Sequence, residues 1–308
     1  MAIMKKGQDL TDVTTAILTG MREILRKEKP DIVLVHGDTS TAFAASLAAF
    51  YQQIPVGHVE AGLRTYNMKS PYPEEFNRQA IGLTASLHFA PTQKAADALL
   101  KEGKNPEQIF VTGNTGIDAL HYTVRNDFYH PETEWAKGSR LIAVTAHRRE
   151  NLGEPMRDMF RAIRRIVEEF ADVKVIYPVH LNPQVRKIAD EEFGGCERIH
   201  LIEPLDVVDF HNLMKASYLI MTDSGGIQEE APALGKPVLV MRDTTERPEG
   251  VEAGTLKLAG TKMEDIYREC RRLLTEPEIY RKMSEARNPY GDGTASIQIR
   301  KILEDIDA

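Results

Sequence analysis

Short apolar runs alternate with segments of helical periodicity along this chain, and this alternation limits the possible fold more than any other feature. Residues 9–28 carry apolar side chains at helical spacing, and residues 32–35 follow as a continuous apolar run. Such runs are typical of parallel strands that are covered on both faces. Because the same unit recurs to the end of the chain, the sequence predicts an α/β fold with two doubly wound, Rossmann-like domains.

The predicted elements fall into two series, separated by a polar stretch over 121–140 that fits a linker. The first series has helices at about 40–52, 74–84 and 92–102, and strands at 55–59, 86–90 and 108–111. The second series has strands at 141–145, 173–179, 199–202, 218–222, 237–241 and 255–258. Its helices are expected at 154–170, 183–192, 206–215, 225–234 and 262–275, with a terminal helix from about 293. We therefore expect domains over 1–120 and 141–292.

Composition excludes several classes of protein. The 308 residues include 39 basic and 46 acidic side chains, and the resulting net charge of −7 argues against nucleic acid or an anionic membrane as a partner. Two cysteines, Cys196 and Cys270, cannot form a disulfide scaffold and suit a reducing cytosol, so we expect a cytoplasmic protein. No apolar run approaches the roughly 18 residues of a membrane helix.

Polar clusters follow five of the predicted strands or helices, at 36–39, 60–64, 70–78, 147–151 and 223–230. Ligands of doubly wound sheets bind beyond the carboxyl ends of the strands, so these clusters are where we expect chemistry. Each cluster also has a purely structural interpretation. Asp38 and Asp223 are in position to be helix N-caps, and Glu74 after a proline is in position to be a first-turn helix acid.

Ser224, Gly225 and Gly226 join a buried-type strand to a helix, so their backbone N–H groups can approach an anion such as a diphosphate. The alternative is a tight strand–helix turn without a ligand. Arg247 can neutralise a phosphate by forked hydrogen bonds, and the alternative is a solvated surface arginine. No Gly-Lys-Ser/Thr ends the turn and no Gly-x-Gly-x-x-Gly follows a strand, so neither a P-loop nor a nicotinamide cofactor is supported.

A catalytic metal is not predicted. His147 and Glu150 lack the His-Glu-x-x-His spacing of zinc proteases, and no paired cysteine ligands exist. His36 with Asp38, and His58 with Glu60, could each offer only two ligands. The remaining histidines of interest are expected to be structural or on the surface: His88, His180, His200 and His211.

Long motifs occur in a fixed order along almost the whole chain. They are His36-Gly-Asp-Thr39, Pro55-Val-Gly-His-Val-Glu-Ala-Gly-Leu-Arg64, Pro71-Tyr-Pro-Glu-Glu75, Thr145-Ala-His-Arg-Arg-Glu-Asn151, Tyr177-Pro-Val-His-Leu-Asn-Pro183, Thr222-Asp-Ser-Gly-Gly-Ile-Gln-Glu-Glu-Ala-Pro232, Arg242-Asp-Thr-Thr-Glu-Arg-Pro-Glu249 and Asn288-Pro-Tyr-Gly-Asp-Gly293. Together they resemble the bacterial non-hydrolysing UDP-N-acetylglucosamine 2-epimerases. The resemblance implies a glycosyltransferase-B arrangement with an interdomain cleft, in which a helix over 293–308 returns to the first domain.

The resemblance implies interconversion of UDP-N-acetylglucosamine and UDP-N-acetylmannosamine for cell-surface polysaccharide synthesis, without a cofactor or metal. The C2 proton is not adjacent to a carbonyl, whereas breaking the anomeric C–O bond acidifies it. Loss of UDP and of that proton gives 2-acetamidoglucal, and UDP then returns. Matched residue by residue, the resemblance assigns catalysis to Asp38, Glu60, Glu74 and His147. We expect Asp38 and Glu60 on opposite faces of C2, Glu74 in support, and His147 at the leaving UDP oxygen.

The resemblance also implies two binding sites and a homodimer. The UDP-binding positions match Phe210 at the uracil, Glu230 at the ribose hydroxyls, and Ser224, Gly225, Gly226 and Arg247. A second UDP-N-acetylglucosamine acts as an allosteric activator in bacterial members, and its site matches Gln8, Glu74, Arg148 and His180. Gly7 replaces an adjacent arginine of that site.

Other functions stay open at this point. A UDP-sugar glycosyltransferase needs an acceptor, and a hydrolysing epimerase releases free N-acetylmannosamine. Family members begin with a βαβ unit that contains Gly-Thr-Arg-Pro-Glu, and these 308 residues lack that string. We therefore expect an incomplete first domain, and the alternative of a catalytically impaired UDP-sugar-binding protein follows. In that case this polypeptide would epimerise weakly, and an N-terminally extended version fully.

Overall fold

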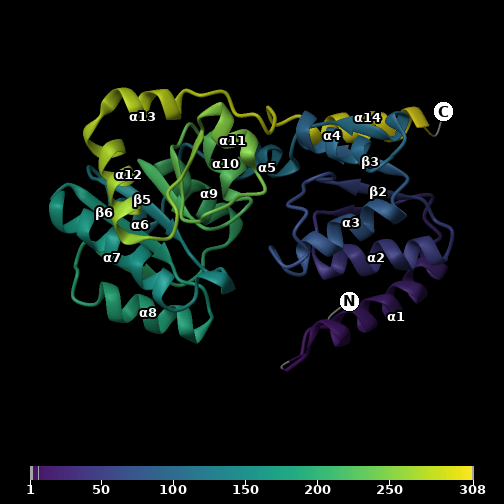
Figure 1. Cartoon of the computed structure of the whole chain (residues 1–308), viewed down its shortest axis with the longest axis horizontal. Helices are drawn as coiled ribbons and strands as arrows, with labels where there is room; N and C mark the ends of the chain where they lie inside the picture. Colours follow the sequence, from purple (N-terminus) through teal and green to yellow (C-terminus); the bar gives the residue numbers. More distant parts are fainter. Residues whose placement is uncertain (1–2, 6, 307–308) are drawn as a thin grey trace. The chain divides into compact units, whose positions relative to one another are not determined.

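The structure is a computed structural model that describes residues 3–5 and 7–306. The chain divides into two compact units (Figure 1). The first unit comprises Met1–Thr115 together with Thr294–Ala308, and the second comprises Gly116–Gly293. The chain therefore passes between the units twice, at Thr115 and at Gly293. The predicted domain limits themselves stay a prediction.

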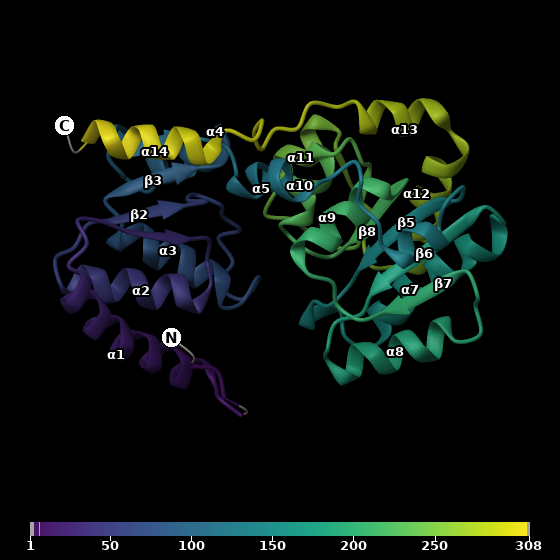
Figure 2. The same ribbon diagram turned by 180° about the vertical axis from the view of Figure 1, so that it is seen from behind.

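The first unit contains a parallel sheet whose strands follow one another in chain order. Its strands are β1 (Val33–His36), β2 (Val56–Val59), β3 (Leu87–Ala90) and β4 (Ile109–Val111). Its helices are α1 (Leu10–Glu28), α2 (Ser40–Tyr51), α3 (Glu74–Thr84), α4 (Gln93–Lys101) and α14 (Ala295–Ile306), and η1 (Pro106–Gln108) is a 3-10 turn. Helix α2 packs between α1 and α3 and against β1. The last helix, α14, lies beside α4 in both views (Figures 1 and 2).

The second unit contains a six-stranded parallel sheet with the order β10-β9-β8-β5-β6-β7. Its strands are β5 (Arg140–Thr145), β6 (Val173–Pro178), β7 (Ile199–Ile202), β8 (Leu219–Thr222), β9 (Val238–Val240) and β10 (Leu256–Leu258). Because the chain runs from β5 outward to β7 and then restarts at β8, the strand order reverses between β5 and β8. This reversal is the topological switch point at which doubly wound sheets bind ligands.

Helices complete the second unit, and its large core lies between the sheet and α7. The helices are α5 (Thr115–Thr123), α6 (Pro131–Trp135), α7 (Glu154–Glu169), α8 (Pro183–Phe193), α9 (Val207–Ala216), α10 (Ile227–Ala233), α11 (Pro248–Ala253), α12 (Met263–Thr275) and α13 (Pro277–Ser284), with the 3-10 turn η2 (Arg149–Asn151). Met156, Phe160 and Ile163 of α7 are fully buried, at the spacing of a single helix face.

The two-domain α/β prediction is confirmed, and the structure adds short helices that were not predicted. The stretch 121–140 is not simply a linker, because it includes the end of α5 and all of α6. Helix α6 begins at Pro131 after His130, whose side chain accepts a hydrogen bond from the Glu132 N–H. Its Trp135 ring stacks on His200, with centroids 3.5 Å apart. A helix this short has too little periodicity to be read from sequence, and α13 was not predicted for the same reason.

Candidate functional site

The first unit gathers polar groups where β1 and β2 end. Asp38 and Glu60 each lie just beyond the carboxyl end of one of these paired strands. Asp38 is not the helix N-cap that its position allows, because Thr39 caps α2 by accepting a hydrogen bond from the Ala42 N–H. The carboxylate of Asp38 instead accepts from Arg78, whose Nη2 lies 2.5 Å from Oδ2. Asp38 is therefore available for a function other than capping.

Glu60 occupies an unusual backbone conformation, with φ of +65°, in the left-handed region that a residue with a side chain rarely adopts. Gly37 faces it, also with positive φ, and a Cβ atom on Gly37 would lie 3.3 Å from Oε2 of Glu60. His36 Nε2 lies 3.5 Å from the same oxygen. His36 ends β1 and Glu60 directly follows β2, so the pairing of these two strands brings the side chains together.

Glu74 and Glu75 begin α3 and behave differently. Glu74 is partly buried in the first turn of the helix, where the helix dipole stabilises a carboxylate. Its interpretation as a first-turn helix acid therefore holds alongside the functional one. Glu75 is fully buried and accepts hydrogen bonds from the backbone N–H groups of Thr65 and Tyr66. It also lies 3.2 Å from Nη1 of Arg78. Sequence reasoning missed Glu75, whose signal was its place in the Pro-Tyr-Pro-Glu-Glu motif.

In the second unit, the loop after β5 is held by a carboxylate after β8. Asp223 is fully buried and accepts hydrogen bonds from the backbone N–H groups of His147 and Arg148, at 3.0 and 2.9 Å, and from the side chain of Asn151. Asp223 does not cap α10, whose N-cap is Gly226. The two strands flank the switch point, so Asp223 fixes the predicted catalytic loop where ligands of this fold bind.

His147 has surroundings that favour its neutral form. Partial burial lowers the pKa of its imidazole, which is still 42% exposed, and the Asp223 carboxylate, 3.6 Å from Nδ1, opposes this effect. Its ring stacks on that of His180, with centroids 5.4 Å apart and planes 12° from parallel. His180 is exposed, as expected for a surface histidine, and this stacking places its ring beside that of His147.

The Ser224–Gly226 turn lies beside a buried group of charges. A Cβ atom on Gly225 would lie 2.6 Å from Nη1 of Arg247, so only glycine leaves room for that guanidinium. Arg247 is buried, which makes the surface interpretation wrong, and it pairs with Glu229 and with Glu246. Sequence reasoning missed both of these carboxylates, although each lies in one of the quoted motifs.

Glu246 connects three arginines. Its carboxylate lies 2.7 Å from Nη1 of Arg247, 2.9 Å from Nη1 of Arg242 and 3.6 Å from Nη2 of Arg148. Burial alone would raise the pKa of Glu246, but the three guanidinium groups lower it to about 2. Three guanidinium groups therefore surround one carboxylate near the turn, and Arg148 also lies 3.8 Å from Glu150.

Helices α9 and α10 carry the other two predicted nucleotide-binding residues, Phe210 and Glu230 respectively. Phe210 is partly buried and packs on the apolar core of this unit. Glu230 Oε2 lies 3.5 Å from Nε2 of His211. His211 is buried, and its Nδ1 lies 2.7 Å from Oγ1 of Thr123 in α5. His211 is thus structural, as expected, but it also contacts a predicted binding residue.

The predicted site residues are divided between the two units. Asp38, Glu60 and Glu74 belong to the first unit with Gln8, whose Oε1 accepts from the Lys5 N–H. The second unit holds all the others: His147, Arg148, His180, Phe210, Ser224, Gly225, Gly226, Glu230 and Arg247. In the first unit, Asp38 and Glu60 both lie next to Gly37. In the second unit, His147 stacks on His180, and Arg247 lies against Gly225.

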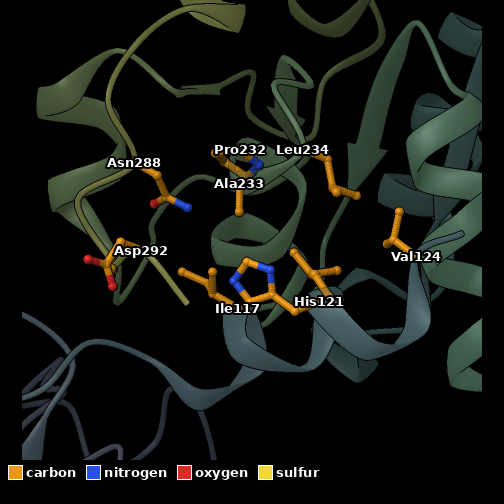
Figure 3. Close-up of a pocket in the computed structure, with 10 residues that line it drawn as sticks. Ile117, His121, Val124, Pro232, Ala233, Leu234, Asn288 and Asp292 are labelled. Atoms are coloured by element: carbon orange, nitrogen blue, oxygen red, sulfur yellow. The ribbon is translucent and has the colours of Figure 1, made fainter. Parts of the chain in front are cut away.

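One cavity of the second unit is separate from these residues. It has a volume of about 500 Å³ and is lined by α5, by the end of α10 and by residues of the 288–292 segment (Figure 3). No predicted site residue lines it. His121 lines the cavity and contacts the position at which Gly293 would carry a Cβ atom, so this segment passes close over α5.

Residues 3–5 and 7–306 contain neither a candidate metal site nor a candidate membrane-spanning helix. No group of three or more His, Cys, Asp or Glu side chains there has the arrangement of a metal site. Nor does any helix in this part of the chain combine the length and apolar character that a membrane crossing needs.

Comparison with known proteins identifies the family. A family model described as UDP-N-acetylglucosamine 2-epimerase matches residues 1–304. The chain belongs to the UDP-N-acetylglucosamine 2-epimerase family. It is 63% identical over 304 residues to the UDP-N-acetylglucosamine 2-epimerase of Bacillus subtilis, covering 99% of this chain and 79% of that protein. The resemblance inferred from the motifs is confirmed, and the family is one of isomerases.

Solved structures of family members have the same fold. A Staphylococcus aureus protein in a co-structure with UDP is 54% identical, with a TM-score of 0.95 over 96% of this chain and 81% of that one. The Neisseria meningitidis UDP-GlcNAc 2-epimerase bound to UDP-GlcNAc is 47% identical, with a TM-score of 0.94 over 98% of this chain and 84% of that one.

Proposed function

We propose that this protein interconverts UDP-N-acetylglucosamine and UDP-N-acetylmannosamine by inverting C2 of the sugar. The reaction proceeds by loss of UDP and of the C2 proton to 2-acetamidoglucal, followed by return of UDP and of a proton to the other face. The observation that carries the proposal is the placement of Asp38 and Glu60 beyond two paired strands, within family motifs. Inversion of C2 needs proton carriers on both faces, and two carboxylates supply them.

Departure of UDP needs stabilisation of the charge that develops on the diphosphate. Arg247, beside the Ser224–Gly226 turn, is the guanidinium that supplies it, and Glu229 and Glu246 hold that group in place. The UDP-bound Staphylococcus aureus relative supports UDP as the leaving group and ligand. Phe210 then lies at the uracil and Glu230 at the ribose hydroxyls.

His147 is assigned to the leaving oxygen of UDP. Because burial lowers its pKa, the imidazole is neutral near pH 7, and a ring N–H donates a hydrogen bond to that oxygen. Negative charge develops there as the bond breaks and strengthens this hydrogen bond, while the proton stays on the ring. Asp223 keeps His147 in position by accepting from its backbone N–H.

Deuterium exchange in D₂O tests the two carboxylates separately from UDP binding. We expect Asp38→Asn and Glu60→Gln each to abolish epimerisation, since each removes the proton carrier on one face. Each of these two variants should still incorporate deuterium at C2 from at most one of the two substrates, UDP-N-acetylglucosamine or UDP-N-acetylmannosamine. Glu74→Gln, which changes the supporting carboxylate, should have the mildest effect of the three. Full exchange in both Asp38→Asn and Glu60→Gln would overturn the assignment.

Regulation and assembly belong to the same proposal. A second UDP-N-acetylglucosamine would bind at Gln8, Glu74, Arg148 and His180, giving a sigmoidal dependence of rate on its concentration. Hyperbolic kinetics, with no effect of UDP-N-acetylglucosamine on the reverse reaction, would argue against that site. The protein would act in the cytoplasm as a homodimer and supply UDP-N-acetylmannosamine for cell-surface polysaccharides. Sedimentation equilibrium would measure the oligomeric state.

A further inference from the structure

His58 is a buried histidine that the proposed reaction does not use. It lies on β2, two residues before Glu60, and its side chain is 1% exposed. Its Nε2 is 2.8 Å from the carbonyl oxygen of Gly37. That oxygen belongs to the peptide bond between Gly37 and Asp38, so the imidazole contacts the backbone directly before a proposed catalytic carboxylate.

Gly37 links the two proposed proton carriers. Asp38 is its chain neighbour, and the Glu60 carboxylate lies so close that a Cβ atom on Gly37 would be 3.3 Å from Oε2. The Gly37 N–H donates to the carbonyl oxygen of Val59, at 3.0 Å. Both backbone polar groups of Gly37 are therefore bound by β2. Its N–H donates to the Val59 carbonyl, and its own carbonyl is bound by the His58 ring.

The imidazole is suited to be a permanent donor. A carbonyl oxygen only accepts, so Nε2 must carry the hydrogen. Burial lowers the pKa of His58 to about 3, with a smaller contribution from His88, which keeps the ring neutral near pH 7. Nδ1 of His58 has no hydrogen-bond partner in the described part of the chain. The ring is therefore a single tautomer that makes this one directed hydrogen bond.

We infer that His58 is a positioning residue for inversion at C2, whose Nε2–H holds the Gly37 carbonyl and so fixes Asp38 and Glu60 relative to each other. The inference rests on the proposed function. His58 touches neither substrate nor the reacting atoms in this account. Misplacement of a catalytic group by about 1 Å can cost as much as 100-fold in rate, so a hydrogen bond at this place has a measurable effect.

His88 provides a matched control. It is the register partner of His58 on β3, is also 1% exposed, and also has an Nδ1 without a partner in the described residues. In the strand order β1-β2-β3, however, His88 is on a strand that does not adjoin β1. Replacing it removes a buried imidazole from the same sheet and leaves the bond to Gly37 intact.

The first experiment compares kinetics of His58→Met, His58→Gln and His88→Met with the wild-type chain. Methionine fills the space without donating, whereas glutamine offers an amide donor near the original Nε2. We expect His58→Met to lower kcat by about tenfold or more with KM changed about twofold or less, and His58→Gln to recover most of kcat. His88→Met should keep a kcat close to that of the wild type. Equal kcat in His58→Met and His88→Met would overturn the inference.

A second experiment does not depend on activity. Nitrogen NMR of the wild-type chain should show His58 as the neutral Nε2–H tautomer from about pH 5 to pH 8. The amide signals of Gly37, Asp38 and Glu60 should shift in His58→Met and stay in place in His88→Met. A His58 ring that titrates within this range, or unmoved amides, would overturn the inference. If the wild-type chain does not epimerise the substrate, the proposed function fails, while the NMR comparison still decides how Gly37 is held.

Discussion

The guanidinium of Arg78 lies 2.5 Å from the carboxylate of Asp38, although the two residues are 40 positions apart in the chain. Its other terminal nitrogen lies 3.2 Å from Glu75, a fully buried carboxylate. Arg78 is itself buried, so it is the cation that balances Glu75 and orients Asp38. A single side chain therefore connects the stability of this unit with the geometry of its proposed active site.

Replacing Arg78 should be costly for stability. Arg78→Met leaves Glu75 buried without its cation, and loss of one partner from a buried pair costs about 3–5 kcal/mol in the free energy of unfolding. Denaturant unfolding followed by circular dichroism measures this change. Arg281→Ala is the control, because it breaks an exposed ion pair with Glu278 and should cost about 0.5 kcal/mol or less. A loss below about 1 kcal/mol in Arg78→Met would contradict the expected role of Arg78 in balancing Glu75.

Asp223→Asn should lower turnover more than substrate affinity. The N–H groups of His147 and Arg148 and the side chain of Asn151 all donate to Oδ2 of Asp223, and an asparagine oxygen at that place is an uncharged, weaker acceptor. The asparagine NH2 group would also replace Oδ1, which accepts from the His147 N–H at 3.2 Å. The loop would then place His147 less accurately, and we expect kcat to fall by about tenfold or more. Steady-state kinetics in both directions measures the effect.

Asp206→Asn is the control for that experiment. Asp206 caps α9 through its side chain, and asparagine is an equally good N-cap, so kcat should be unchanged. If the two variants had the same kcat, the proposed positioning role of Asp223 would be wrong.

The sequence predicted the strands well because parallel strands covered on both faces are continuous apolar runs, as in 32–35 and 141–145. It also placed Asp38, Glu60 and His147 in polar clusters after predicted strands, and these residues lie beyond the ends of β1, β2 and β5. Short elements escaped detection. Helix α6 depends on the stacking of Trp135 on His200, a contact across 65 positions that no local pattern records.

Partners of the site residues could not be predicted for the same reason. Single-residue interpretations took Asp38 and Asp223 as possible N-caps and Arg247 as a possible surface residue. The structure assigns them instead to Arg78, to the 147–151 loop and to Glu246 respectively. The contacts of Asp38 and Asp223 join segments that are far apart in the chain, and the contact of Arg247 joins it to its chain neighbour Glu246. A sequence pattern indicates which element carries a charge, but the packing of elements determines what that charge contacts.

Gly225→Ala should weaken UDP binding more than Gly226→Ala. The new Cβ atom at position 225 would lie 2.6 Å from Nη1 of Arg247, so the guanidinium must move away from the turn. At position 226 the nearest atom is Oε1 of Glu230 at 3.7 Å, an ordinary contact. We expect a loss of about tenfold or more in affinity for the first variant, corresponding to about 1.4 kcal/mol, and a smaller loss for the second. Isothermal titration calorimetry with UDP measures both, and equal affinities would refute this account.

The buried histidines should make the first unit lose stability in acid. Burial lowers the pKa of His88 to about 4 and that of His58 to about 3, whereas an unfolded histidine has a pKa of about 6.5. Below pH 6.5 the unfolded state therefore binds protons that the folded state does not, so stability is full above pH 6.5 and falls as the pH is lowered. Each histidine contributes up to about 1.4 kcal/mol per pH unit until its folded pKa is reached.

His88→Gln isolates one of these contributions without touching the bond to Gly37. In the wild type, the free energy of opening β2 and β3, measured by hydrogen exchange of their amides, should fall between about pH 6.5 and pH 4.5. In the variant this free energy should fall less steeply with decreasing pH, because glutamine does not titrate. The difference in slope corresponds to the uptake of up to one proton on opening. Carboxylates contribute equally to both proteins, so the difference between the two slopes belongs to His88. Identical slopes would mean that His88 binds a proton as readily in the folded chain as in the unfolded one.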